Sequence, residues 1–80
     1  MRVDKYLKVA RIIKRRSVAN QACSVGAIKI NGKEAKPGSK VKIGDFIKVE
    51  LGVKPREYEV LMIAETVTKE QAQEMYRQIS

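Results

Sequence analysis

The sequence contains no histidine and no tryptophan, and it has a single cysteine, Cys23. Histidine and cysteine supply many of the general bases and nucleophiles of enzymes, and the nine acidic residues are scattered along the chain. A lone cysteine has no partner for an intramolecular disulfide and no companions for a zinc site, which indicates a reducing, cytoplasmic compartment. The composition therefore predicts a binding protein that is not an enzyme and holds no metal or other cofactor.

Long hydrophobic stretches are also missing. No stretch approaches the length that crosses a bilayer, and charged residues interrupt the N-terminal region where a secretory signal needs an apolar run. Only four aromatic residues are present, spread singly as Tyr6, Phe46, Tyr58 and Tyr76. We therefore expect no membrane-spanning segment, and no aromatic sheet surface on which successive nucleic-acid bases stack.

What the sequence does contain is an excess of positive charge at one end. Of its 80 residues, 17 are Lys or Arg and nine are Asp or Glu, a net charge of +8. Residues 1–16 carry seven bases and one acid, a net +6, whereas residues 55–80 carry three bases and five acids, a net −2. A basic excess at one end favours an extended anionic partner, either nucleic acid or an acidic membrane, over a small neutral ligand.

Residues 2–13 have the spacing of an amphipathic helix that ends near Ile13. Its apolar residues fall in one arc of the helical wheel, namely Val3, Tyr6, Leu7, Ala10 and Ile13. Its basic residues fall in the opposite arc, namely Arg2, Lys5, Lys8, Arg11 and Arg15. Asp4 stands within the basic arc, four residues before Lys8, and we expect it to order the basic side chains.

A second short helix follows a basic turn formed by Lys14, Arg15 and Arg16. We expect the Ser17 hydroxyl to cap its N-terminus and Gly26 to end it. The residues between form a small apolar stripe, namely Val18, Ala19, Ala22 and Cys23. Cys23 is accordingly expected in the core. Three cationic residues would then crowd the corner between the two helices.

After Gly26 the hydrophobic period changes from that of a helix to that of a strand. Asn31-Gly32 suits a tight hairpin turn between strands over residues 27–30 and 33–35. Further turn signals precede a strand over residues 46–51, which we pair with a strand over residues 56–63. The core-facing residues of these two strands are expected to be Ile47, Val49, Leu51, Tyr58, Val60 and Met62.

The C-terminal segment has the signature of a third helix. Thr68 and Gln71 have the spacing of a capping box. Apolar residues then recur at helical intervals, namely Ala72, Met75, Tyr76 and Ile79. The predicted fold class is α+β: two helices, a small curled antiparallel sheet and a C-terminal helix, in a single domain over residues 1–80.

The motifs resemble, in order and spacing, the S4 domain, the RNA-binding domain named after ribosomal small-subunit protein four. The resemblance covers residues 1–51 and is carried by residues 2–7, 11, 14–17, 26, 30–33, 36–38 and 41–45. The Lys-Arg-Arg-Ser junction and the short acidic C-terminal segment look most like the RqcP group of bacterial ribosome-associated quality-control factors. Related heat-shock S4 proteins usually have a longer basic tail.

The resemblance implies an RNA-binding factor that is not a catalyst. RqcP-like proteins bind large ribosomal subunits obstructed by peptidyl-tRNA, contact large-subunit rRNA and tRNA, and assist RqcH in adding alanine tails to stalled chains. The matching RNA-binding positions in this sequence are Arg2, Lys5, Arg11, Arg15 and Arg16, with Lys8 and Lys33 as further candidates. Arginine suits this task because its planar guanidinium can grip a phosphate with two parallel hydrogen bonds.

Other functions stay open on the sequence alone. The heat-shock relatives suggest recycling or rescue of ribosomal subunits. The chain could also be the RNA-binding module of an RNA-modifying enzyme, although 80 residues leave no room for a catalytic domain. Membrane-surface binding is disfavoured because the apolar arc of the first helix has the small residues of a packed helix. We expect a cytoplasmic monomer.

Overall fold

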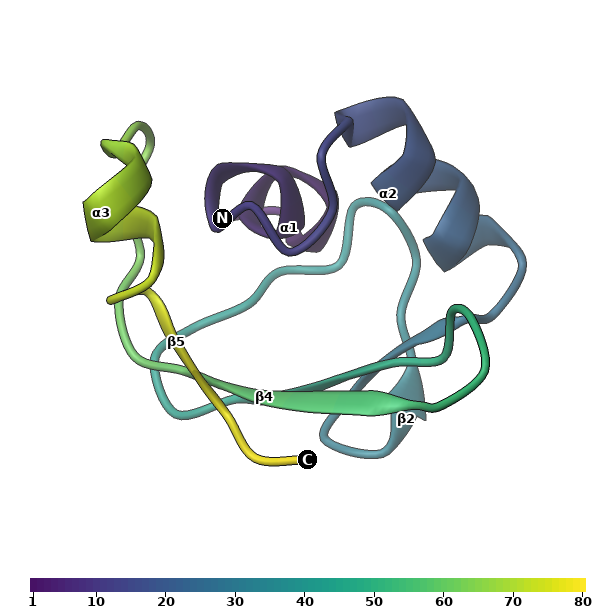
Figure 1. Ribbon diagram of the computed structural model, residues 1–80. Coiled ribbons are helices and arrows are strands. Elements are labelled where there is room, and N and C mark those ends of the chain that lie inside the picture. The colour runs from purple at the N-terminus through teal and green to yellow at the C-terminus, as the bar shows by residue number, and fades with distance from the viewer.

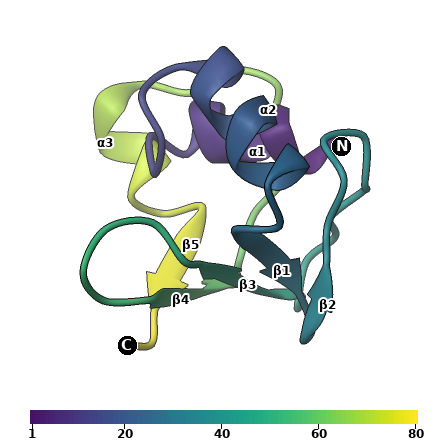
Figure 2. The same cartoon turned by 90° about the vertical axis from the view of Figure 1, so that its right-hand side faces the viewer.

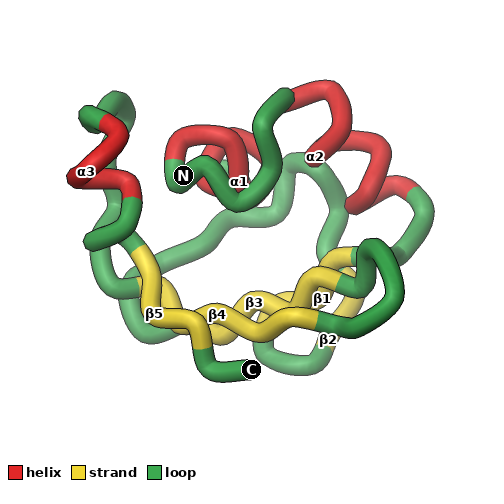
Figure 3. The backbone as a smooth tube through the Cα atoms, in the orientation of Figure 1, coloured by secondary structure: helices red, strands yellow, loops and turns green.

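The computed structural model describes all residues, Met1–Ser80, and confirms the predicted α+β class. Its helices are α1 (Val3–Val9), α2 (Arg16–Ser24) and α3 (Lys69–Ala72). Its strands are β1 (Ile28–Ile30), β2 (Lys33–Glu34), β3 (Phe46–Val49), β4 (Arg56–Val60) and β5 (Tyr76–Gln78). The helices lie over one face of a curved sheet (Figures 1 and 3). None of them is long and apolar enough to cross a membrane.

The five strands form one antiparallel sheet in the order β2-β1-β3-β4-β5 (Figure 2). Tyr58 and Val60 of β4 are buried, and Glu59 lies between them on the opposite face. The buried face packs against apolar residues of α1 and α2, including Cys23, whose predicted place in the core is confirmed. Burial, and to a lesser extent the charge of Asp4, raises the pKa of the Cys23 thiol, which keeps it protonated and unreactive.

Helix α1 ends at Val9, four residues before the predicted end. Arg11 adopts a left-handed backbone with φ of 60°, a conformation that glycine usually takes at the end of a helix. The N–H groups of Arg11 and Ile12 donate to the carbonyls of Lys8 and Leu7, each at 3.0 Å, which closes the helix. Ile13 is still buried, although it lies in the returning loop rather than in the helix.

Helix α2 begins two residues earlier than predicted, and Ser17 does not cap it. Arg15 is the N-cap residue, and no side chain accepts a hydrogen bond from the first turn. The other end agrees with the prediction, because Gly26 has φ of 78° and its N–H donates to the Cys23 carbonyl at 3.1 Å. A Cβ atom on Gly26 would lie 2.6 Å from a carboxylate oxygen of Glu34, an exposed side chain that can move, so the positive φ is the stronger constraint.

The predicted Asn31-Gly32 hairpin turn is confirmed. Both residues have positive φ, 52° and 86°, as a type I′ turn requires. The Asn31 side chain also joins this turn to the next one, because its Nδ2 donates to Asp45 Oδ1 at 3.1 Å. The other oxygen of Asp45 accepts the Lys42 N–H at 3.0 Å. The two turns predicted separately therefore form one hydrogen-bonded unit.

The strands β3 and β4 pair as predicted but are shorter than expected. Strand β3 ends at Val49, and Leu51 beyond it is 38% exposed instead of facing the core. Strand β4 ends at Val60, so Met62 lies outside the strand and is only partly buried. The alternation of apolar residues continues past the point where pairing between the strands stops.

The prediction of a C-terminal helix reaching Ile79 is wrong. The capping box is present, since Thr68 and Gln71 exchange side-chain and backbone hydrogen bonds, but α3 ends at Ala72. The following residues form β5, in which Tyr76 pairs with Val60. A turn followed by an edge strand buries Ala72 and Met75 as a helix would, and the strand gains backbone hydrogen bonds from β4.

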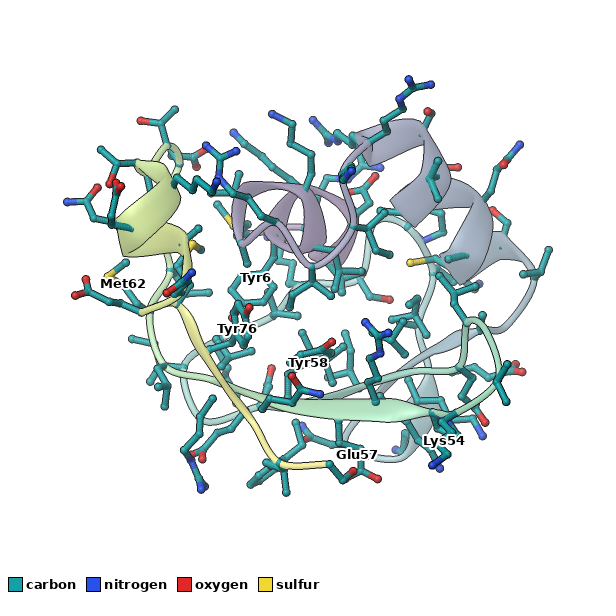
Figure 4. The ribbon with its side chains drawn as sticks, in the orientation of Figure 1. Tyr6, Lys54, Glu57, Tyr58, Met62 and Tyr76 are labelled. Atoms are coloured by element: carbon teal, nitrogen blue, oxygen red, sulfur yellow. The ribbon has the colours of Figure 1, made fainter.

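One buried hydrogen bond ties α1 to this C-terminal segment. The Tyr6 hydroxyl donates to the Met75 carbonyl oxygen at 2.7 Å, and that oxygen also accepts the N–H groups of Leu61 and Met62. Figure 4 shows Tyr6 directed from α1 toward Tyr76. Burial, and then the neighbouring Tyr76, raises the pKa of Tyr6 well above its ordinary value, so the hydroxyl stays a donor.

We expect Tyr6→Phe to lower the free energy of unfolding by about 1 kcal/mol, because it removes one buried hydrogen bond. The Met75 carbonyl keeps two other donors, which limits the loss. Urea unfolding would measure the change. Tyr76→Phe is the control, since its hydroxyl forms no hydrogen bond within the protein. An equal loss in both variants would contradict a specific role for the Tyr6 hydroxyl.

Candidate nucleic-acid interface

The outer side of α1 and the turn before α2 carry a concentration of cations. We call this surface the cationic face, formed by Arg2, Lys5, Lys8, Arg11, Lys14, Arg15 and Arg16. All of these residues except the half-buried Lys5 are exposed. Nitrogen-tipped side chains project outward from α1 and the start of α2 in Figure 4. Six of the seven predicted RNA-binding residues therefore share one face of the molecule.

Asp4 lies beneath the cationic face and holds two of its arginines. The residue is only 1% exposed. Its carboxylate oxygens lie 3.0 Å from a guanidinium nitrogen of Arg2 and 3.6 Å from one of Arg16. Oδ1 also accepts the backbone N–H of Lys5 at 2.8 Å. Asp4 thus orders basic side chains as predicted, but through Arg2 and Arg16 rather than through Lys8.

A polar groove surrounds these two arginines. It has a volume of about 530 Å³ and is lined by Arg2, Asp4, Arg16, Ser17, Asn20 and Gln21. The side chains of Arg2 and Arg16 keep 49% and 47% of their surface exposed. Each guanidinium has five donors, so the pairing with Asp4 leaves several of them free for a ligand. We call this cavity the Arg2–Arg16 groove.

The N-terminus of α2 opens at the same place. Because no side chain caps this helix, the N–H groups of its first turn remain available to an anion. Arg15, the N-cap residue, is exposed and takes part in no ion pair. Arg15 and Arg16 therefore lie beside free backbone N–H groups, and the expected Ser17 cap is absent.

Asn20 and Gln21 belong to this groove but were not among the predicted site residues. Asn20 follows Arg16 by four positions, the spacing that places two side chains on the same face of a helix. This spacing was a usable signal in the sequence. Gln21 stands one position further around α2 and lines the groove beside it.

Lys5 forms an ion pair that the sequence did not reveal. Its ammonium group binds the carboxylate of Glu65, sixty positions away in the segment before α3. The hydrogen bond from Lys5, together with its charge, lowers the pKa of Glu65 below the ordinary value. Lys5 therefore contributes less free positive charge to the cationic face than the four residues that form no ion pair, Lys8, Arg11, Lys14 and Arg15.

Lys33 is not brought together with the arginines. It begins β2, the edge strand of the sheet, away from α1 and α2 (Figure 2). The residue is exposed, but it lies outside the cationic face.

Comparison with known proteins identifies the family. Residues 1–47 match the S4 domain model. The chain belongs to the S4 domain family. It is 49% identical to the RQC P-site tRNA stabilizing factor of Listeria monocytogenes over 95% of this chain and 83% of that protein. It is 46% identical to the Bacillus subtilis factor of the same name over 95% and 88% of the two chains.

The heat-shock branch of the S4 family is also similar. The Heat shock protein 15 homolog of Aeromonas salmonicida is 40% identical over 81% of this chain and 49% of that protein. The trimeric structure of Vibrio cholerae Heat Shock Protein 15 has a TM-score of 0.91 at 32% identity, covering 100% and 82% of the two chains. The solution structure of hypothetical protein HP1423 has a TM-score of 0.85 at 33% identity, covering 100% and 98%.

We expect Asp4→Asn to weaken RNA binding and to lower the free energy of unfolding by about 1–3 kcal/mol, because the charge that strengthens the hydrogen bond from Arg2 and the ion pair with Arg16 is lost. Asp45→Asn is the matched control, since it also neutralises a buried carboxylate but lies away from the arginines. Urea unfolding and RNA titration would be measured for both. Equal losses of RNA affinity would show that Asp4 acts only through stability.

We expect Arg11→Gly to raise the free energy of unfolding by up to about 1 kcal/mol, because glycine adopts the left-handed backbone without strain. Arg11→Ala removes the same charge while keeping the strained conformation, and it should not stabilise. Both variants should bind RNA less tightly than the wild type. If alanine stabilised as much as glycine, backbone strain at this position would be refuted.

Proposed function

We propose that this S4 domain protein is a ribosome-associated quality-control factor that binds structured RNA through its cationic face. The observation that supports this most is the pair of half-exposed arginines, Arg2 and Arg16, held by one buried carboxylate beside an uncapped helix N-terminus. The similarity to RQC P-site tRNA stabilizing factors, at 46–49% identity over most of both chains, supports the ribosomal context.

The chemistry of the face favours an RNA backbone. The deep major groove of an RNA helix is closed to side chains, so proteins recognise such helices through phosphates, 2′-hydroxyls and shape. Arg2 and Arg16 present fixed guanidinium groups, and the first turn of α2 presents backbone N–H donors. If ~5 phosphate contacts form, log affinity should fall with log salt at a slope of roughly −3.5 to −4.5.

The proposed ligands are large-subunit rRNA and the tRNA of a peptidyl-tRNA retained on an obstructed large subunit. In this role the protein acts in the cytoplasm as a monomer and binds without catalysing a reaction. It stabilises the tRNA so that a tailing partner, RqcH, can extend the stalled chain with alanine. The name of the similar P-site tRNA stabilizing factors supports the tRNA ligand.

A second candidate function is recycling or rescue of subunits without tailing. The similarity of the chain to heat-shock S4 proteins, whose resemblance suggested this role in the sequence, favours it. Reconstitution would separate the two functions: large subunits carrying peptidyl-tRNA, RqcH and alanyl-tRNA are combined with or without this protein. Stimulated alanine incorporation supports tailing, whereas retention or release of peptidyl-tRNA without incorporation supports recycling or rescue.

We expect Arg16→Ala to shift the protein from the large-subunit peak of a sucrose gradient to the top. Arg77→Ala is the matched control, because Arg77 is also an exposed arginine paired with a carboxylate, Glu59, at 2.6 Å. Both substitutions should change the free energy of unfolding by less than about 1 kcal/mol, because Arg77 and Glu59 form a surface ion pair and because the buried Asp4 keeps Arg2 and the Lys5 N–H as partners when Arg16 is removed. Each fraction is probed for the tagged protein and for peptidyl-tRNA.

Co-migration of wild type and Arg77→Ala with peptidyl-tRNA-bearing large subunits, and loss for Arg16→Ala alone, would support the function and the site together. Wild-type protein at the top of the gradient would refute the ribosomal function. Equal loss in both variants would refute the assignment of Arg16 to the interface.

A further inference from the structure

A second groove lies at the other end of α1. Its volume is about 550 Å³, and it runs between the end of α1 and the segment that leads into α3. Its charged lining residues are Lys8, Arg11, Lys14, Lys69 and Glu65. It shares no lining residue with the Arg2–Arg16 groove. We call it the α1–α3 groove.

The positive charge of this groove is largely uncompensated. None of its four cations lies within 4.0 Å of a carboxylate, because the ion pairs of the protein involve only Arg2, Lys5, Arg16, Lys29 and Arg77. Four cations and one acid give a net charge of +3. The acid, Glu65, is itself bound to Lys5. Clustered like charges repel one another, and a polyanion would relieve that repulsion.

Three independently fixed segments bring these cations together. Arg11 is held by the hydrogen bonds that close α1. Lys14 follows the buried Ile13, which anchors the returning loop. Lys69 opens α3 directly after the Thr68 capping box, whose helix is anchored by the buried Ala72. The spacing of the cations is therefore set by the fold rather than by free side-chain motion alone.

The remaining lining residues restrict the chemistry of a ligand. They are Val9, Thr66 and Val67, so the groove offers a hydroxyl and a small apolar surface but no aromatic ring. Without an aromatic ring, the groove has no surface for stacking a base. Ammonium and guanidinium groups around an open groove suit successive phosphates of a nucleic-acid backbone.

We propose that the α1–α3 groove is a second phosphodiester-backbone site, which holds an RNA strand apart from the phosphates bound by Arg2 and Arg16. The proposal rests on the proposed function in taking RNA as the ligand. Lys69 lies beyond residues 1–47, which match the S4 domain model, so the site is built jointly by that motif and the C-terminal segment. Glu65 limits binding there because its carboxylate repels phosphate.

The test compares two triple variants of the full chain that remove the same charge. The groove variant is Lys8→Gln/Lys14→Gln/Lys69→Gln, and the control is Lys36→Gln/Lys42→Gln/Lys54→Gln, three exposed lysines elsewhere. Binding of a fluorescein-labelled RNA stem-loop is followed by fluorescence anisotropy at several salt concentrations. The groove variant should reduce the salt slope by about 2 and the affinity by about tenfold or more, while the control changes both much less.

Two further variants sharpen the result. Glu65→Gln should raise the affinity by a few fold, since it removes the negative charge from the groove. The variant that combines Arg16→Ala with the groove substitutions should show a decrease in log affinity equal to the sum of the two separate decreases, as expected for independent sites. The proposal would be overturned if the two triple variants had equal salt slopes. It would also be overturned if Glu65→Gln left RNA affinity unchanged or lowered it.

This outcome is independent of the ribosome experiment. If wild-type protein fails to enter the large-subunit peak but the groove variant alone loses salt slope, the ribosomal function fails and the groove stands. If wild-type protein enters the peak and the groove variant keeps the full slope, the function stands and the groove site is refuted.

Discussion

The buried carboxylate of Asp4 is the constraint on which the cationic face depends. A charge with only 1% of its residue exposed requires compensation, because an unpaired buried carboxylate would cost several kcal/mol. Arg2 precedes α1 and Arg16 begins α2. Because both arginines pair with the carboxylate of Asp4, the starts of the two helices are held together. Their other donors remain in solvent. The need to compensate the buried Asp4 thus positions Arg2 and Arg16, the guanidinium groups proposed to bind RNA.

The C-terminal segment shapes the same surface from the other side. The hydrogen bond from Tyr6 to the Met75 carbonyl fixes this segment against α1, and the pairing of β5 with β4 completes its anchoring. As a consequence, Glu65 reaches Lys5 and Lys69 reaches the groove beside Arg11. Residues 55–80 carry a net negative charge. Within them, Glu65 neutralises Lys5 on the cationic face, whereas Lys69 adds a positive charge to the α1–α3 groove.

The features that the sequence predicted are those fixed by short-range geometry. Gly26 and the Asn31-Gly32 pair need positive φ, and the capping box needs only a spacing of three residues. The absent Ser17 cap and the early end of α1 are local failures, whereas two other features were missed because they depend on long-range contacts. Whether Tyr76 continues a helix or pairs with Val60 depends on the free edge of β4, which no local pattern contains. The partner of Lys5 lies sixty residues away, and Arg11 occupies a backbone conformation that favours glycine.

The distribution of ion pairs makes the molecule electrically polar. On the sheet, Lys29 pairs with Glu50 at 3.2 Å and Arg77 pairs with Glu59 at 2.6 Å, so two of the cations there are neutralised locally. Over α1, only Asp4 and Glu65 oppose seven cations. These seven cations and two acids give +5 of the net charge of +8, so most of the net charge lies on the side that carries both grooves. Such an asymmetric field orients the protein before contact, because the cationic face is drawn first to a polyanion such as RNA.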